Sequence, residues 1–153
     1  IPTMREVLRI MPNNIWLNIH LKGNRELGVE VAKLIVSENR MPQSVVACES
    51  KATQGVQSVN TDIAICNMER LGSRTAYIDE TIKKGYPFIQ LKKSRNNDDF
   101  ASDIQRLKKQ GIHINYVQAD TGKEMAELVD LGVDFILTDH LTELLDAFKG
   151  LRK

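Results

Sequence analysis

Short runs rich in β-branched and apolar residues alternate along the chain with segments whose apolar residues recur at helical spacing. Each run is bounded by the polar and turn-forming residues that usually flank strands. Six runs predict strands: Ile15–Lys22, Ser44–Ser50, Ile63–Glu69, Phe88–Lys92, Ile112–Ala119 and Asp134–Asp139. The pattern therefore predicts strand and helix in strict alternation.

The segments between the strands carry apolar stripes with a repeat of three or four residues. Four stripes predict helices: Leu27 to Ile35, Phe100 to Leu107, Met125 to Val129 and Leu141 to Phe148. Weaker stripes predict two more, over Lys51–Asn60 and Ala76–Lys84. Two pairs have capping-box spacing: Thr3 with Glu6, and Thr121 with Glu124. Glycines follow three of the helical segments, where a left-handed residue ends a helix: Gly85, Gly111 and Gly132.

Strands that alternate with helices must run parallel, joined by crossover helices. An open doubly wound sheet and a (β/α)8 barrel both satisfy this requirement. In the first strand, Asn18, His20 and Lys22 are polar and the residues between them are apolar. A sheet covered by helices on both faces would be apolar on both sides, whereas a barrel interior turns polar toward its mouth. The pattern favours an α/β fold, a partial TIM barrel of six parallel βα units within one domain, 1–153. The doubly wound sheet is the alternative.

Composition excludes several classes of function. Apolar residues make up 42% of the chain and charged residues 27%, as in soluble globular domains. The net charge of +1 and the lack of a long apolar stretch predict no nucleic-acid partner and no membrane span. The chain also lacks the glycine-rich phosphate loops, the G-x-S-x-G turn and the H-E-x-x-H helix. Cys48 and Cys66 lie in apolar runs and are expected to be buried free thiols.

Charged and hydrogen-bonding residues gather where the strands end, which is where ligands bind in both architectures. His20 and Lys22 point the same way, roughly 6.6 Å apart along the strand. The ammonium group can hold a phosphate oxygen, and the imidazole can bind a metal or transfer a proton. The simpler alternatives are a hydrogen-bonded wall residue and a solvated strand end.

Later strand ends contribute Glu49, Gln90 and Lys92. Such a ring of polar groups suits an anionic substrate and a divalent metal. Lys92 also begins a basic cluster with Lys93 and Arg95. This cluster either holds a phosphate or, as charge runs usually do, forms a solvated loop.

Four segments match, in order, segments of one enzyme family. Ile1–Leu8 matches "IPTLEEVL", and Asn18–Gly23 matches the "N-I-E-I-K" strand that follows it. Gly111–Met125 aligns without gaps with a penultimate strand and helix, and Leu131–Asp139 matches the final strand "LGVDGIITD". The chain thus resembles the glycerophosphodiester phosphodiesterases from end to end, although Lys51–Lys93 matches mainly in order and spacing.

The resemblance implies a TIM barrel that hydrolyses glycerophosphodiesters to an alcohol and glycerol 3-phosphate with a divalent cation, usually Ca²⁺ or Mg²⁺. It also implies a catalytic histidine pair in "H-R-G" and "H-D" motifs and metal-binding carboxylates in "E-x-D". These motifs belong to two βα units that would precede Ile1. We therefore expect this stretch alone to be inactive, and its two open barrel edges to favour self-association.

Lys22 corresponds to the lysine of "E-I-K" and is the expected catalytic residue, in contact with the phosphate. The glutamate of that motif, a metal ligand in the family, is His20 here, which suits Zn²⁺ or Mn²⁺ better than Ca²⁺. Glu49 is expected to compensate as a second ligand, while Gln90 and Lys92 bind substrate. The leading hypothesis is a metal-dependent hydrolase of a small-molecule phosphodiester. The alternative is a non-catalytic relative that binds a phosphorylated small molecule.

Overall fold

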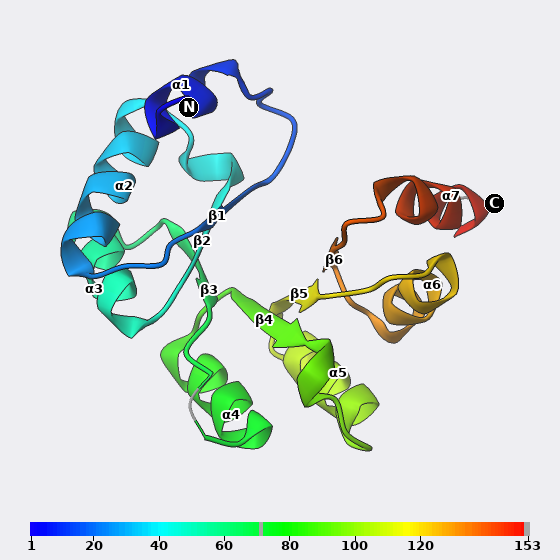
Figure 1. The fold of residues 1–153 in the computed structure, drawn as a ribbon. Coiled ribbons are helices and arrows are strands. Elements are labelled where there is room, and N and C mark those ends of the chain that lie inside the picture. Colours follow the sequence, from blue (N-terminus) through cyan, green and yellow to red (C-terminus); the bar gives the residue numbers. More distant parts are fainter. Residues whose placement is uncertain (71, 152–153) are drawn as a thin grey trace. The chain divides into compact units, whose positions relative to one another are not determined.

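The computed structural model describes residues 1–70 and 72–151, and its elements alternate as predicted (Figure 1). The strands are β1 (Leu17–His20), β2 (Ser44–Cys48), β3 (Ala64–Asn67), β4 (Phe88–Lys92), β5 (His113–Val117) and β6 (Phe135–Leu137). The α-helices are α1 (Met4–Ile10), α2 (Arg25–Ser37), α3 (Ser50–Val59), α4 (Arg74–Lys84), α5 (Phe100–Lys109), α6 (Gly122–Leu131) and α7 (Leu141–Leu151). Two 3-10 turns, η1 (Met41–Gln43) and η2 (Lys93–Arg95), complete the set.

The chain divides into two compact units, Ile1–Glu69 and Arg70–Lys153. In the first unit β1 pairs with β2 and β2 with β3; in the second β4 pairs with β5 and β5 with β6. Every one of these pairs is parallel and joins strands that are consecutive in the chain. Consecutive order is typical of a barrel, whereas a doubly wound sheet reverses its order at a switch point. The predicted fold class, an α/β partial barrel, is confirmed.

The first unit is organised around two helices whose backbones lie in close contact. Gly28 of α2 and Gly55 of α3 are both buried. A Cβ atom built at Gly55 would lie 2.0 Å from the carbonyl oxygen of Arg25, and one built at Gly28 would lie 2.2 Å from that of Ala52. The two helices therefore approach more closely than any side chain at these positions would allow.

The second unit buries one hydrophobic core between its strands and α4, α5 and α6. Ile89 and Ile114 contribute to it from β4 and β5, and Ile104 and Met125 from the helices, all of them fully buried. The opposite side of the strands begins with a row of aromatic rings in contact. Phe88 lies 4.9 Å from His113 and 5.9 Å from Phe135, measured between ring centroids. His113 is thus a structural residue in this row.

Both predicted capping sites exist, but they differ in detail. At Thr3 the reciprocal bonds with Glu6 are complete, as predicted. At Thr121 the hydroxyl oxygen accepts from the amide of Glu124 at 3.2 Å. The Glu124 carboxylate, however, accepts from the amide of Asp120 at 3.1 Å and not from that of Thr121. The second capping box is therefore formed in one half only.

The predictions for the two cysteines and for the three helix-ending glycines agree with the structure. Cys48 and Cys66 are buried free thiols, and burial raises the pKa of Cys48. Gly85, Gly111 and Gly132 have positive φ angles, as the helix-ending pattern predicted. In the part of the chain that the structure describes, each helix is too short or too polar to cross a membrane.

Asp134, directly before β6, contacts residues of both α5 and β5 through its carboxylate. Its carboxylate accepts from the ammonium of Lys108 at 2.6 Å and from the amide of Ile114 at 2.8 Å, and it lies 3.4 Å from Nδ1 of His113. Burial raises the pKa of Asp134, but these hydrogen-bond donors lower it more, so that the pKa lies below its ordinary value. The folded state therefore favours the ionised carboxylate.

Replacing Asp134 with asparagine should lower the free energy of unfolding at pH 7 by about 1 kcal/mol, because the carboxylate is partly screened by water. A depressed pKa adds stability above the unfolded-state pKa, near 3.9, which is lost as pH falls through the lower folded-state value. Urea unfolding should therefore separate the two proteins at pH 7 and separate them less at an acidic pH below the unfolded-state pKa. Asp130→Asn, at an exposed position, is the control. An equal difference at both pH values would contradict the role assigned to the carboxylate.

Candidate functional site

Polar side chains line one side of β1 in the first unit. Leu17 and Leu21 are buried, while Asn18, His20 and Lys22 are exposed. The alternation read from the sequence is therefore present in the fold. It places the imidazole and the ammonium group on the same side of the strand, with Lys22 just beyond its carboxyl end.

The register between β1 and β2 brings Glu49 to the same edge. His20 lies beside Ala47, and the amide of Leu21 donates to the Ala47 carbonyl at 2.9 Å, so the two chains stay adjacent past the strand ends. Lys22 and Glu49 follow directly on each side, and both are exposed. Among residues 1–70 and 72–151 neither side chain takes part in a hydrogen bond or an ion pair. Both groups are thus available to a ligand.

A second carboxylate, Glu69, lies at the amino end of α3 and was assigned no role from the sequence. It accepts from the backbone amide of Ser50 at 2.9 Å, and its own amide donates to Oδ1 of Asn67 at 2.9 Å. Asn67 is 3% exposed and lies beside Cys48 in the strand register. The position of Glu69 at the end of the third predicted strand was the signal that could have identified it.

The predicted metal ligands, His20 and Glu49, stand at the ends of the paired strands β1 and β2. An imidazole and a carboxylate are a suitable pair of donors for a divalent cation. Within the described residues, however, no group of three or more His, Cys, Asp or Glu side chains could hold a metal ion. The two residues fit a cation only as part of a larger ligand set.

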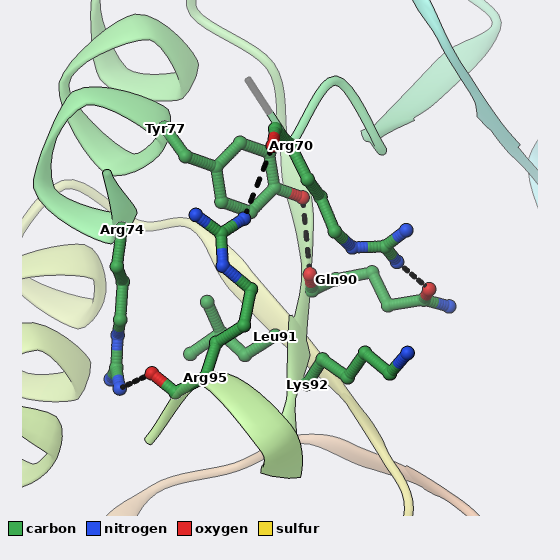
Figure 2. A pocket seen from close by; sticks show the side chains of 7 residues that line it. All are labelled: Arg70, Arg74, Tyr77, Gln90, Leu91, Lys92 and Arg95. Atoms are coloured by element: carbon green, nitrogen blue, oxygen red, sulfur yellow. Dashed lines mark hydrogen bonds between the residues drawn. The ribbon is translucent and has the colours of Figure 1, made fainter. Parts of the chain in front are cut away.

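Gln90 and Lys92 occupy one side of β4 in the second unit, and Leu91 between them is buried in the core. Gln90 is 5% exposed, whereas Lys92 is exposed at the strand end. The side-chain oxygen of Gln90 accepts a hydrogen bond from the guanidinium of Arg70, and its backbone carbonyl accepts from the hydroxyl of Tyr77 at 3.1 Å (Figure 2). Arg70 is therefore part of this site.

The loops that follow β3 and β4 are fastened to each other by arginines. The guanidinium of Arg95 donates to the backbone carbonyls of Arg70 at 3.3 Å and Gly72 at 2.7 Å. Arg74 donates in return to the carbonyl of Arg95 at 3.2 Å. It also lies 2.9 Å from the carboxylate of Asp103. Burial lowers the pKa of Arg74, and Asp103 opposes that effect.

The basic cluster after β4 is not a solvated loop as a whole. Arg95 is engaged by backbone carbonyls. Lys93 lies 3.2 Å from the carboxylate of Asp120 and 2.9 Å from that of Glu124. The hydrogen bonds that Lys93 donates to Glu124 and to Asp120 raise its pKa. Of these three basic residues, Lys92 is the one whose side chain makes no hydrogen bond or ion pair in the part of the chain that the structure describes.

Two hollows flank the side chain of Gln118, which donates to Asp139 at 3.2 Å. One has a volume of about 330 Å³ and is lined in part by Lys92 and Asp120. The other has a volume of about 400 Å³ and is lined in part by Asp139 and Leu141. Both volumes lie in the range of small-molecule sites.

No protein-family model matches the chain, and no curated protein matches it. Solved structures do. A glycerophosphodiester phosphodiesterase from Parabacteroides distasonis matches 99% of this chain over 66% of its own, with a TM-score of 0.80 and 17% identity. A phosphodiesterase from Oleispira antarctica, in complex with the product sn-glycerol-3-phosphate, matches 97% of this chain over 62% of its own, with a TM-score of 0.76 and 16% identity.

The chain has a partial glycerophosphodiester phosphodiesterase-like fold. It spans 62% to 66% of the length of these two structures. The likeness establishes the fold, and at this level of identity the function has to be argued from the residues. The predicted site residues fall into two groups: His20, Lys22 and Glu49 in the first unit, and Gln90 and Lys92 in the second. Their roles stay predictions.

Proposed function

We propose that the chain is part of a metal-dependent phosphoric diester hydrolase that converts a glycerophosphodiester and water to an alcohol and glycerol 3-phosphate. The observation that supports it most is the fold shared with phosphodiesterases along nearly the whole chain. One of those structures holds sn-glycerol-3-phosphate, the product of such a reaction. The catalytic histidine pair would lie in the two βα units that this stretch lacks.

Lys22 would act as the catalytic residue of this stretch by holding a phosphate oxygen. Its ammonium group is exposed at the carboxyl end of β1. Negative charge on the phosphate oxygens is shared with the attacking and leaving oxygens during hydrolysis, and a fixed cation stabilises it. A lysine suits this role as a compact point charge.

His20 and Glu49 would bind a divalent cation together with ligands that this stretch does not supply. The family resemblance implies Ca²⁺ or Mg²⁺, whereas the imidazole favours Zn²⁺ or Mn²⁺. When bound, such a cation neutralises charge on the phosphate. Gln90 and Lys92 would bind the substrate, because they present an amide and an ammonium group on one side of β4.

The full-length gene product should hydrolyse glycerophosphocholine, a representative glycerophosphodiester. Turnover should disappear with a chelator and return with one cation from a panel of Ca²⁺, Mg²⁺, Mn²⁺ and Zn²⁺. Release of glycerol 3-phosphate measures it, and the chain 1–153 alone should show none. A full-length protein that is folded and inactive with every cation would contradict the proposal.

A second function, a non-catalytic module that binds a phosphorylated small molecule, is favoured by the imidazole of His20 where a metal-binding carboxylate is expected. Binding of glycerol 3-phosphate without turnover by the full-length protein would identify it.

Either form could associate through its sheet edges. β1 is paired with β2 and β6 with β5, and self-association through these strands stays a prediction.

A further inference from the structure

Two cations that lack acidic partners lie beside the buried side chain of Gln90. Arg70 donates one hydrogen bond to Oε1 of Gln90, and its Nε is buried without a hydrogen-bond partner. Lys92 follows Gln90 two positions later in β4, on the same side of the strand, and is exposed. Within residues 1–70 and 72–151, neither cation has a carboxylate within ion-pair distance. The local charge of +2 is thus uncompensated.

Two of the three neighbouring basic side chains have acidic partners, and the third is held by backbone carbonyls. Arg74 is paired with Asp103 at 2.9 Å, and Lys93 is paired with Glu124 at 2.9 Å. Arg95 is held by two backbone carbonyls. A guanidinium whose Nε is buried without a hydrogen-bond partner is destabilising unless an acceptor completes it. The contrast with these neighbours therefore points to an absent anionic ligand.

The orientation of the Gln90 amide agrees with an anion as the ligand. A guanidinium can only donate, so its hydrogen bond fixes the oxygen of the amide toward Arg70. The NH₂ group then points away from Arg70. Figure 2 shows the side chains of Gln90 and Lys92, which come from β4, and of Arg70, which comes from the segment after β3, extending in the same direction, while Arg74 lies apart. The donor groups of these three side chains therefore lie on the same side.

The row is held in place by its surroundings. The backbone carbonyl of Arg70 accepts from Arg95 at 3.3 Å, and the backbone carbonyl of Gln90 accepts from the Tyr77 hydroxyl at 3.1 Å. Gln90 itself is 5% exposed, so its amide has little freedom. Donors that are positioned before the ligand arrives cost less entropy on binding. The site is preorganised for a small ligand.

We propose that Arg70, Gln90 and Lys92 form a binding site for the dianionic phosphate group of a phosphate monoester. A phosphodiester carries one negative charge, whereas a monoester carries close to two at neutral pH and matches the two free cations. Guanidinium groups bind phosphate through parallel N–H bonds, and the amide and the ammonium add further donors. The proposal deepens the proposed function, on which it rests for the choice of glycerol 3-phosphate as ligand, and it assigns Arg70, with Gln90 and Lys92, to the phosphate group of that product.

Nuclear magnetic resonance titration of the ¹⁵N-labelled chain 1–153 tests this site without any turnover. Inorganic phosphate and glycerol 3-phosphate, added at pH 8, should shift the side-chain amide signals of Gln90 in a saturable way. Dimethyl phosphate, a monoanion, should bind at least fivefold more weakly. Lys92→Gln should weaken phosphate binding at least fivefold, and Arg70→Gln should abolish it. Lys109→Gln, an equal loss of charge at an exposed position of α5, should leave it unchanged.

Several results would overturn the proposal: no saturable shift at Gln90, equal binding of dimethyl phosphate and inorganic phosphate, or unchanged affinity in Lys92→Gln. Lys92 is exposed, so its variant should fold even if Arg70→Gln does not. Failure of this site and failure of the hydrolase proposal are separable. Phosphate binding by the chain with no turnover by the full-length protein would remove the hydrolase proposal alone. Turnover with unchanged phosphate binding in Lys92→Gln would remove this site alone.

Discussion

Replacing Gly55 with alanine should lower the free energy of unfolding of the chain by about 3 kcal/mol or more. The direction of this change in the free energy of unfolding distinguishes a steric effect from an effect of helix propensity. In a helix interior, alanine is usually more stable than glycine by about 1 kcal/mol, because glycine loses more backbone entropy on folding. Gly55 lies within α3, so an effect of helix propensity alone would raise stability.

Steric overlap with α2 makes the Gly55→Ala substitution destabilising instead of stabilising. A Cβ atom at Gly55 would lie 2.0 Å from the carbonyl oxygen of Arg25 and 2.9 Å from the amide nitrogen of Val29. Both are backbone atoms of α2, so no change of rotamer can relieve the contact, and the helices have to separate. Separation would loosen the packing of Ala52 and Val56, which are 1% and 0% exposed.

Urea unfolding followed by circular dichroism measures the effect of Gly55→Ala. Gln54→Ala is the matched control, because it adds alanine to the same helix at an exposed position. The control should change stability by only a few tenths of a kcal/mol. A Gly55→Ala protein as stable as the control would mean that α2 and α3 do not lie as close as the structure places them.

The sequence could not reveal this contact, although it predicted both helices. Apolar periodicity reports which face of a segment is buried, and that was sufficient to place α2 and α3. A glycine inside a helix reads only as a loss of propensity. Whether Gly55 meets another backbone depends on how two helices cross, which is a property of the pair. The role of Gly28 and Gly55 in the close packing of α2 and α3 can therefore be recognised only from the folded structure.

The residues of the candidate functional site could also be predicted only in part from the sequence. Side chains that could bind a ligand are expected at the carboxyl ends of parallel strands, so Lys22 in the first unit and Lys92 in the second could each be placed from the strand pattern alone. Their partners could not, because long-range pairs depend on which loops lie together. Glu124 shows the difference: its spacing from Thr121 predicted a capping box, but its carboxylate also binds Lys93, which is 31 residues away. Backbone carbonyls far away in the sequence likewise bind the guanidinium of Arg95. Among the described residues the side chain of Lys92 has no such partner, and the sequence could not show this difference.

Replacing Lys22 with alanine should lower kcat/KM of the full-length gene product for a glycerophosphodiester by a factor of about 10² to 10³. The lysine is exposed and makes no hydrogen bond or ion pair in the part of the chain that the structure describes. Stability should therefore be unchanged, and the loss should come from phosphate charge that is no longer stabilised. Lys22→Arg keeps the charge in a different shape and should retain part of the activity.

Lys33→Ala is the control for Lys22→Ala, because Lys33 is a lysine of the same unit that is 60% exposed in a surface pair with Glu30. Such pairs contribute little to stability, so this variant should keep full activity. If Lys22→Ala also stayed within threefold of the unmodified enzyme, Lys22 would not contact the phosphate. If the loss in Lys22→Ala lay in KM alone, the ammonium would bind substrate and transition state equally. A loss mainly in kcat is the result expected for a cation that acts on charge developing during the reaction.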